Sequence, residues 1–183
     1  MATGAGPAFD GPDFDWLTPQ LAVGGSQAPR DAWALARVHG IDAVIDLRAE
    51  ACDDVELLSL HGVQFLHLPT HDLAPLSQEV LDEGVTFANR VLWGGRRLLI
   101  HCEHGIGRSA TLALCVLISR GDPPLEALRL AKTRRWKLSP NPEQYECWVQ
   151  WIQRWREGGG IDLAPPDFET FADVAYAHLR PAG

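Results

Sequence analysis

The sequence has no apolar stretch long enough to span a lipid bilayer. Its longest mostly apolar stretch, residues 110–118, is far shorter than the ~20 residues that a transmembrane helix needs. Residues 1–15 lack the basic and apolar regions of a secretory signal peptide. We therefore expect no membrane span, and we expect the protein in the cytoplasm.

Cysteine and basic residues are also scarce. The four cysteines are irregularly spaced, which excludes a recognisable disulfide framework and favours a reducing compartment. The 16 Lys and Arg against 24 Asp and Glu give a net charge of −8, which argues against a nucleic-acid-binding protein. A zinc site built on His101, Cys102 and His104 is disfavoured because no second ligand pair has zinc-site spacing. The 46% hydrophobic content allows one sizeable core.

Residues 98–109 have the pattern of a strand, a tight loop and the start of a helix. Residues 98–100 form a short apolar run typical of a buried strand, and residues 110–118 continue as an apolar helix. Gly105 and Gly107 can adopt backbone angles closed to other residues, so successive N–H groups can converge at the helix N-terminus. This arrangement predicts a cradle for a phosphate group.

The loop places Cys102 and Arg108 together at this cradle. Converging amides, the helix dipole and the guanidinium favour the thiolate form of Cys102, a nucleophile. Arg108 can hold two phosphate oxygens in bidentate fashion, and Ser109 can donate a hydrogen bond to the sulfur when it leaves a phosphocysteine. A buried structural cysteine beside an Arg–carboxylate pair is the alternative, but it leaves the two glycines unexplained.

These residues carry a family resemblance. His101, Cys102, Arg108 and Ser109 resemble the HCxxGxxRS signature of the cysteine-dependent protein tyrosine phosphatases, most closely the compact dual-specificity branch, over roughly residues 16–155. The resemblance implies phosphate-monoester hydrolysis through a phosphocysteine, with no metal and no cofactor. It also implies that the substrate is held by the loop residues Glu103, His104, Gly105, Ile106 and Gly107.

The substrate class is less sharply indicated. We favour a dual-specificity or tyrosine protein phosphatase; a phosphatase of a small phosphorylated metabolite or phosphoinositide is the alternative. His104 is the only further potential cation in the loop, which does not favour highly charged inositol phosphates. A phosphate-binding pseudophosphatase scaffold is a third possibility, against which the joint presence of Cys102, Arg108 and Asp72 argues. The expected partner is a phosphorylated protein or small phosphomonoester, not nucleic acid; the oligomeric state is left open.

Two further site positions follow from the resemblance. The family's general acid comes from a loop about thirty residues before the cysteine, which matches Asp72, although the neighbouring His71 titrates near neutrality and is a rival. The family also places an Asn or Gln near the site. Asn141 is the closer match, and Gln144 could instead position the hydrolytic water.

Strands alternating with helices predict an α/β fold with a central, mostly parallel sheet flanked by helices. The expected strands include residues 43–48 and 63–68, and ligands in such sheets bind at the carboxyl ends of the strands. We expect a flexible leader over residues 1–13, a catalytic domain over 14–156 and a tail over 157–183. The apolar stripe of that tail suits a docked helix.

Basic residues raise two questions that the sequence leaves open. Arg48 ends a buried strand and is either a second cation beside the phosphate or a structural partner for a loop carboxylate. Five further basic residues crowd into the segment 129–137. They form either a solvated helix end or a surface that attracts polyanionic substrates, and the residues concerned are Arg129, Lys132, Arg134, Arg135 and Lys137.

Overall fold

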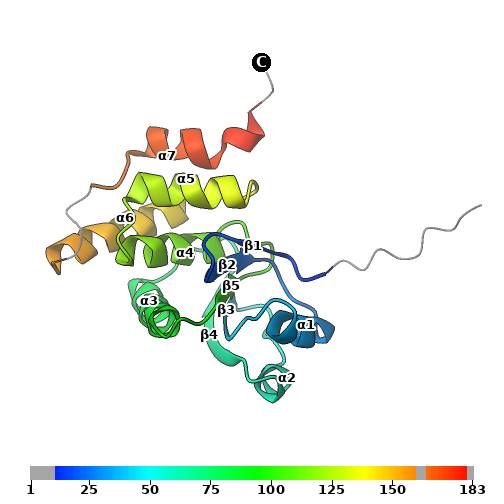
Figure 1. Ribbon diagram of the computed structural model, residues 1–183. Coiled ribbons are helices and arrows are strands. Elements are labelled where there is room, and N and C mark those ends of the chain that lie inside the picture. The colour runs from blue at the N-terminus through cyan, green and yellow to red at the C-terminus, as the bar shows by residue number, and fades with distance from the viewer. Residues whose placement is uncertain (1–10, 160–163, 181–183) are drawn as a thin grey trace, which may run out of the picture.

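The computed structural model describes residues 11–159 and 164–180. A five-stranded sheet with the strand order β1-β2-β5-β3-β4 lies between helices (Figure 1). Its strands are β1 (Phe14–Trp16), β2 (Leu21–Gly24), β3 (Ala43–Arg48), β4 (Gln64–Thr70) and β5 (Leu98–His101). Only β1 pairs antiparallel, with β2, whereas the other pairings are parallel. The expected α/β fold with a mostly parallel sheet is confirmed.

The helices form layers of unequal depth. The helices on one face are α1 (Ala32–Arg37), which follows a short 3-10 turn, η1 (Pro29–Asp31), and α2 (Val55–Leu60). The helices on the other side are α3 (Gln78–Trp93), α4 (Arg108–Ser119), α5 (Pro124–Arg134), α6 (Pro142–Glu157) and α7 (Phe168–Ala175), followed by η2 (Ala177–Leu179). Figure 1 shows α5 stacked on α4 and α7 outermost, beside α5.

Side chains of the central strands alternate between two cores. Val44 and Leu99 are paired in register and pack beneath α1 and α2. The next pair, Ile45 and Ile100, packs into the larger core beneath α3 and α4. Both faces are therefore buried, which is why the first three residues of β3 and of β5 are all apolar. The polar loops that follow β3, β4 and β5 meet at one edge of the sheet.

The start of α6 is fixed by side-chain caps. The helical spacing of Trp148, Trp151, Ile152 and Trp155 predicts a helix over residues 145–155 with these side chains in the core, but α6 begins at Pro142. Asn141 and Gln144 form a capping box, in which each side chain binds the other's backbone N–H, and Pro142 has no N–H to satisfy. The predicted core face of this helix is confirmed for Trp148 and Trp151, which are buried.

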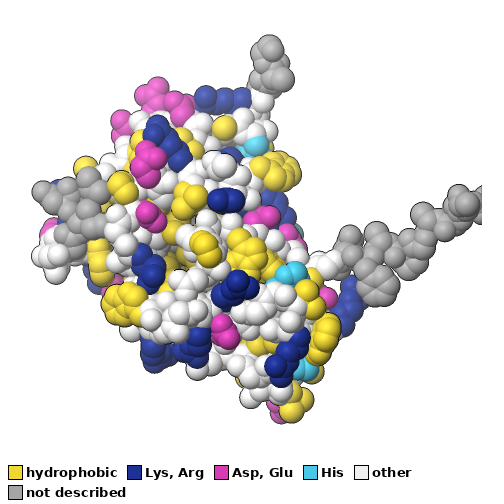
Figure 2. Space-filling model, viewed as in Figure 1, with side chains coloured by type: hydrophobic (Ala, Val, Ile, Leu, Met, Phe, Trp, Pro, Cys, Tyr) yellow, Lys and Arg dark blue, Asp and Glu magenta, His cyan; other side chains and the backbone are white. Residues whose placement is uncertain are grey.

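The C-terminal helix α7 is docked on the domain. Phe171 is fully buried, with its ring centroid 4.7 Å from that of Tyr145 on α6. The expected leader lies mostly outside the described residues, as do residues 160–163 and 181–183. Among the described residues no helix has the length and apolarity to cross a membrane. On the face shown in Figure 2, basic and acidic side chains are interspersed.

Candidate active site

Cys102 lies where β5 ends and the loop to α4 begins. Its side chain is almost fully buried, and its Sγ lies 3.3 Å from Oγ of Ser109 in the first turn of α4. The backbone N–H of Cys102 donates to the carbonyl of Gly24 on β2. The thiol is thus held at the floor of the loop, within hydrogen-bond reach of a hydroxyl, as the sequence suggests.

The two glycines of the loop have different structural reasons. Gly105 has φ of 65°, and a Cβ there would collide with the backbone of Gly24 and with the guanidinium of Arg135. Gly107 has a negative φ, but a Cβ would overlap the side-chain amide of Gln144. Gly105 is therefore required by its positive φ and by the close approach of its neighbours, whereas Gly107 is required by close approach alone.

Arg108 is buried and already has protein partners. Its Nη1 and Nη2 donate to the two carboxylate oxygens of Glu50 at 2.8 and 2.6 Å. Nη1 also donates to the Thr70 carbonyl at 2.8 Å, and Nη2 donates to Asp72 at 2.9 Å. The hydrogen bonds from Arg108 lower the pKa of Glu50 to about 2, so this carboxylate is charged at neutral pH.

Asp72 lies in the loop between β4 and α3, with about half of its side chain exposed. The next residue, Leu73, has a φ of 62°, which is strained for a residue with a branched side chain. The Leu73 carbonyl accepts a hydrogen bond from Nδ2 of Asn141 at 2.8 Å, which ties this loop to the start of α6. The loop is thus held in a conformation that keeps Asp72 over Arg108.

A small hollow brings most of the predicted site together. It has a volume of about 120 Å³, and it is lined by Asp72, Leu73, Cys102, His104, Ile106, Gly107, Arg108, Ser139, Asn141 and Gln144. Both Asn141 and Gln144 line it, and Gln144 donates to the carbonyl of Ala74. His71, the rival general acid, is exposed and does not line the hollow. The side chain of Glu103 points instead toward Arg48, at 3.5 Å.

A buried ionic network lies behind the loop. Arg48 donates to Asp46 at 2.9 Å and to Asp53 at 2.7 Å, and Nε2 of His101 lies 2.8 Å from the other oxygen of Asp53. Burial alone would raise the pKa of Asp46, but Arg48 and His101 hold it below its ordinary value. This geometry matches the structural alternative for Arg48, as a partner of a loop carboxylate.

The same network contains the groups that come nearest to a metal site. Among the described residues, Asp46 can share a metal either with Cys52 and His67 or with Asp53 and His101. Both oxygens of Asp46 already accept hydrogen bonds from Arg48. A metal there would have to break this ion pair, so neither group is a ready site, and neither includes Cys102.

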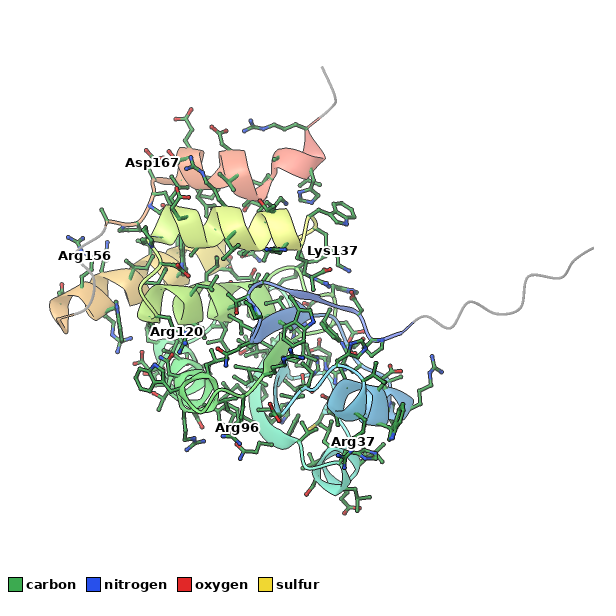
Figure 3. The ribbon with its side chains drawn as sticks, viewed as in Figure 1. Arg37, Arg96, Arg120, Lys137, Arg156 and Asp167 are labelled. Atoms are coloured by element: carbon green, nitrogen blue, oxygen red, sulfur yellow. The ribbon has the colours of Figure 1, made fainter. Side chains whose placement is uncertain are left out.

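Within the basic segment at the end of α5, Arg135 differs from both expectations. Arg135 is 1% exposed, so it is not part of a solvated helix end, and it does not line the hollow. It pairs with Asp13 and Asp15 instead, while Lys137, labelled beyond α5 in Figure 3, pairs with Asp13 at 3.3 Å. Arg134 is exposed, as a solvated helix end would have it.

Sequence reasoning missed Glu50, and it placed Arg135 in a basic surface segment rather than against the loop. Glu50 binds Arg108, and Arg135 binds the outer side of the loop. The available signal for Glu50 is its place just after the carboxyl end of β3, at the edge where sites lie in parallel sheets. Nothing in the local sequence distinguishes Arg135 from its exposed neighbour Arg134.

Comparisons with known proteins agree with this geometry. A family model described as the dual specificity phosphatase catalytic domain matches residues 26–154. Dual specificity protein phosphatase 2 of Mus musculus is 32% identical over 127 residues, covering 68% of this chain and 38% of that protein. The Homo sapiens protein of the same name is 30% identical over 137 residues, covering 74% of this chain and 42% of that protein. The chain thus spans about two-fifths of the length of these relatives.

Solved structures share the fold. Tk-PTP in its active form superposes with a TM-score of 0.72 at 29% identity, covering 78% of this chain and 98% of that one. PTPMT1 in complex with PI(5)P superposes with a TM-score of 0.75 at 22% identity, covering 80% and 99%. With a family model over most of its length and the signature loop in place, this chain belongs to the dual specificity phosphatase family.

Proposed function

We propose that the chain is a dual-specificity or tyrosine protein phosphatase in which Cys102 is the nucleophile, Arg108 binds the phosphate and Asp72 is the general acid. The observation that carries this proposal is the convergence of these three side chains on one hollow. A thiol, a guanidinium and a carboxylate are the groups that hydrolysis through a phosphocysteine requires.

In the first step the thiolate of Cys102 attacks phosphorus, and the bond from phosphorus to the leaving oxygen breaks in line with it. Asp72 gives its proton to that oxygen, so the alcohol or phenol leaves uncharged. Arg108 and the loop amides, from Glu103 through His104, Gly105, Ile106 and Gly107, hold the equatorial oxygens. This preorganised charge stabilisation is the largest contribution we expect.

In the second step water attacks the phosphocysteine. Asp72, now a carboxylate, takes a proton from the water, and sulfur leaves as a thiolate. Ser109 lies 3.3 Å from that sulfur and can donate a hydrogen bond as its charge develops. Asn141 and Gln144 line the hollow on the side of Asp72, where their amides can orient the water.

The lining of the hollow supports a substrate with a single phosphate on an apolar group. Leu73 and Ile106 are apolar, and Arg108 is the one Lys or Arg among the lining residues. Arg135 and Lys137 are engaged with acidic residues of the N-terminal segment. A phosphotyrosine ring fits such a rim better than a headgroup with several phosphates, which needs additional cations.

The test is a substrate panel at matched ionic strength. Phosphate release would be measured from p-nitrophenyl phosphate, from phosphotyrosine and phosphothreonine peptides, and from vesicles containing PI(5)P. We expect activity on the aryl phosphate and the highest kcat/KM on phosphopeptides. Higher kcat/KM on the vesicles would overturn the protein-phosphatase proposal while leaving the nucleophile assignment intact.

Cys102→Ser is the matched variant for the nucleophile. A serine alcohol is not ionised near neutral pH, whereas the loop amides and Arg108 remain to bind phosphate. We expect loss of turnover to below a few per cent with substrate binding largely retained, measured by phosphate release and calorimetry.

Arg108→Lys should lose both binding and rate, since a point charge lacks the bidentate fork.

A further inference from the structure

The carbonyl groups on the outer side of the loop between Cys102 and Arg108 are all hydrogen-bonded over residues 103–106. Four consecutive carbonyls of the loop each accept a hydrogen bond from a donor outside it. The pairs are Ser26 N to Glu103 at 2.8 Å, Arg135 Nη2 to His104 at 3.1 Å, Arg135 Nε to Gly105 at 2.7 Å and Ser139 N to Ile106 at 3.0 Å. One side chain, Arg135, therefore supplies two of the four donors.

These bonds fix the direction of the loop amides. A peptide unit is planar and trans, so its N–H points opposite to its C=O. With the carbonyls of residues 103–106 held outward, the N–H groups of residues 104–107 are turned to the side of the hollow. Within the described part of the chain, none of these four N–H groups has a protein acceptor, so they remain free for phosphate oxygens.

Arg135 is held in place from a distant part of the sequence. Its guanidinium donates to Asp15 at 2.8 Å and to both oxygens of Asp13, the shorter at 3.0 Å. Burial alone would raise the pKa of Asp13, but hydrogen bonds from Arg135 and the charge of Lys137 lower it, so this partner is charged at neutral pH. The N-terminal strand thus reaches the back of the loop through a single buried cation.

Resting on the proposed function, we propose that Arg135 is a positioning residue of the phosphate site, which acts by turning the Gly105 and Ile106 amides toward the substrate. A donor bound to a carbonyl also polarises its peptide and strengthens the N–H on the other side. Asp13 and Asp15 set the orientation of the guanidinium. Gly105 has no side chain, so the guanidinium of Arg135 can reach the loop backbone.

The test separates positioning from stability. Arg135→Lys keeps the charge, but an ammonium group cannot reach two carbonyls and two carboxylates in the fixed plane of a guanidinium. We expect its affinity for tungstate, a phosphate-like oxyanion, to fall about tenfold or more in titration calorimetry. KM for p-nitrophenyl phosphate should rise in parallel. The matched control, exposed Arg134→Lys, should retain wild-type values.

A second pair of variants covers the case in which Arg135→Lys is unstable. The double variant Asp13→Asn with Asp15→Asn keeps Arg135 but loosens its orientation, so its tungstate affinity should fall between those of the wild type and Arg135→Lys. Ile152→Ala, a buried change on α6, should lower the melting temperature without changing the affinity of the folded protein. Ile152→Ala thus serves as the control for a loss of stability without a change in tungstate affinity.

Each outcome bears on one proposal separately. Wild-type tungstate affinity in folded Arg135→Lys, or in the double Asp variant, would overturn the positioning role even if the wild type hydrolyses phosphate monoesters. Tungstate binding that depends on Arg135, in a wild-type protein that releases no phosphate from any monoester, would support the positioning role and overturn the proposed function.

Discussion

At the scale of single residues, the hydrogen bonds of Arg108 decide how a phosphate can enter. A guanidinium has five N–H donors, and the four on Nη1 and Nη2 already reach Glu50, the Thr70 carbonyl and Asp72. Glu50 occupies the edge formed by Nη1 and Nη2, which leaves Nε and the Nη2 hydrogen shared with Asp72. A phosphate that binds side-on must therefore replace Asp72. In the proposed mechanism the released carboxylate takes up a proton from solvent and then gives it to the leaving oxygen.

Glu50→Gln is the direct test of this arrangement. The amide has one acceptor oxygen and no charge, so Arg108 loses its bidentate partner and its fixed orientation. We expect kcat/KM for p-nitrophenyl phosphate to fall about tenfold or more, mainly through KM. Glu56→Gln, an exposed change on α2, serves as the control. Equal kcat/KM values in the two variants would show that Glu50 does not orient Arg108 for phosphate binding.

Asp72→Asn tests the general acid. Substrates with poor leaving groups need a proton at the leaving oxygen, whereas activated aryl phosphates do not. We expect a rate loss of about 10² to 10⁴ for a phosphoserine-like alkyl phosphate and a much smaller loss for p-nitrophenyl phosphate. The parallel variant His71→Asn should leave both rates nearly unchanged. If both classes of substrate lose equally in Asp72→Asn, the acid lies elsewhere.

At the scale of elements, the C-terminal helix α7 braces the segment that carries Asn141. Lys132 on α5 donates to the carbonyls of Leu138 and Ala175, and the hydroxyl of Tyr176 donates to the carbonyl of Pro140. The family model ends at residue 154, before this helix. The tail of this chain therefore contacts the backbone just ahead of the site.

Two phenylalanines on α7 provide a matched pair for testing the docking. Phe171 is fully buried, whereas Phe168 is 42% exposed. Phe171→Ala should lower the free energy of unfolding by about 3 to 5 kcal/mol, because a large buried ring leaves a cavity. Phe168→Ala should cost clearly less. Denaturant unfolding measures both, and equal losses would show that α7 does not pack in solution as it does here.

At the scale of the whole molecule, ionisable groups limit stability at both ends of the pH range. The pKa of Glu50 is lowered from 4.5 to about 2 by its hydrogen bonds to Arg108. Burial raises the pKa of Cys147 from 9.0 to about 11 and that of Cys115 well above 9.0. Folding thus favours the carboxylate of Glu50 and the neutral thiols of both cysteines.

The sign of each contribution follows from linkage. The contribution of Glu50 to the free energy of unfolding is fully present above about pH 4.5 and is lost as the pH falls toward 2. The contribution of Cys147 to the free energy of unfolding is fully present below about pH 9 and is lost as the pH rises toward 11. We expect urea midpoints to fall on both sides of a neutral plateau. Cys147→Ala should flatten the alkaline fall, and a slope equal to that of the wild type would contradict this assignment.

Much of the fold was predictable because its signals are local. The strand Ala43–Arg48 has the predicted bounds, since its apolar start at residues 43–45 is typical of a strand buried on both faces. The start of α6 was predicted three residues too late, because the Asn141–Gln144 capping box and Pro142 extend the helix beyond its apolar stripe. The loop from Cys102 to Arg108 was recognisable because one short segment carries the thiol, the glycines and the guanidinium.

The sequence by itself determined the α/β fold, the family and the candidate nucleophile, because each rests on residues that are neighbours in the chain. Only the tertiary structure decided which charges meet. Glu50 lies 58 residues from Arg108, and Asp13 lies 122 residues from Arg135. Pairings over such separations depend on strand order and on which side chains are buried. Arg134 and Arg135 therefore look alike in the sequence, yet one is solvated and the other holds the phosphate loop from behind.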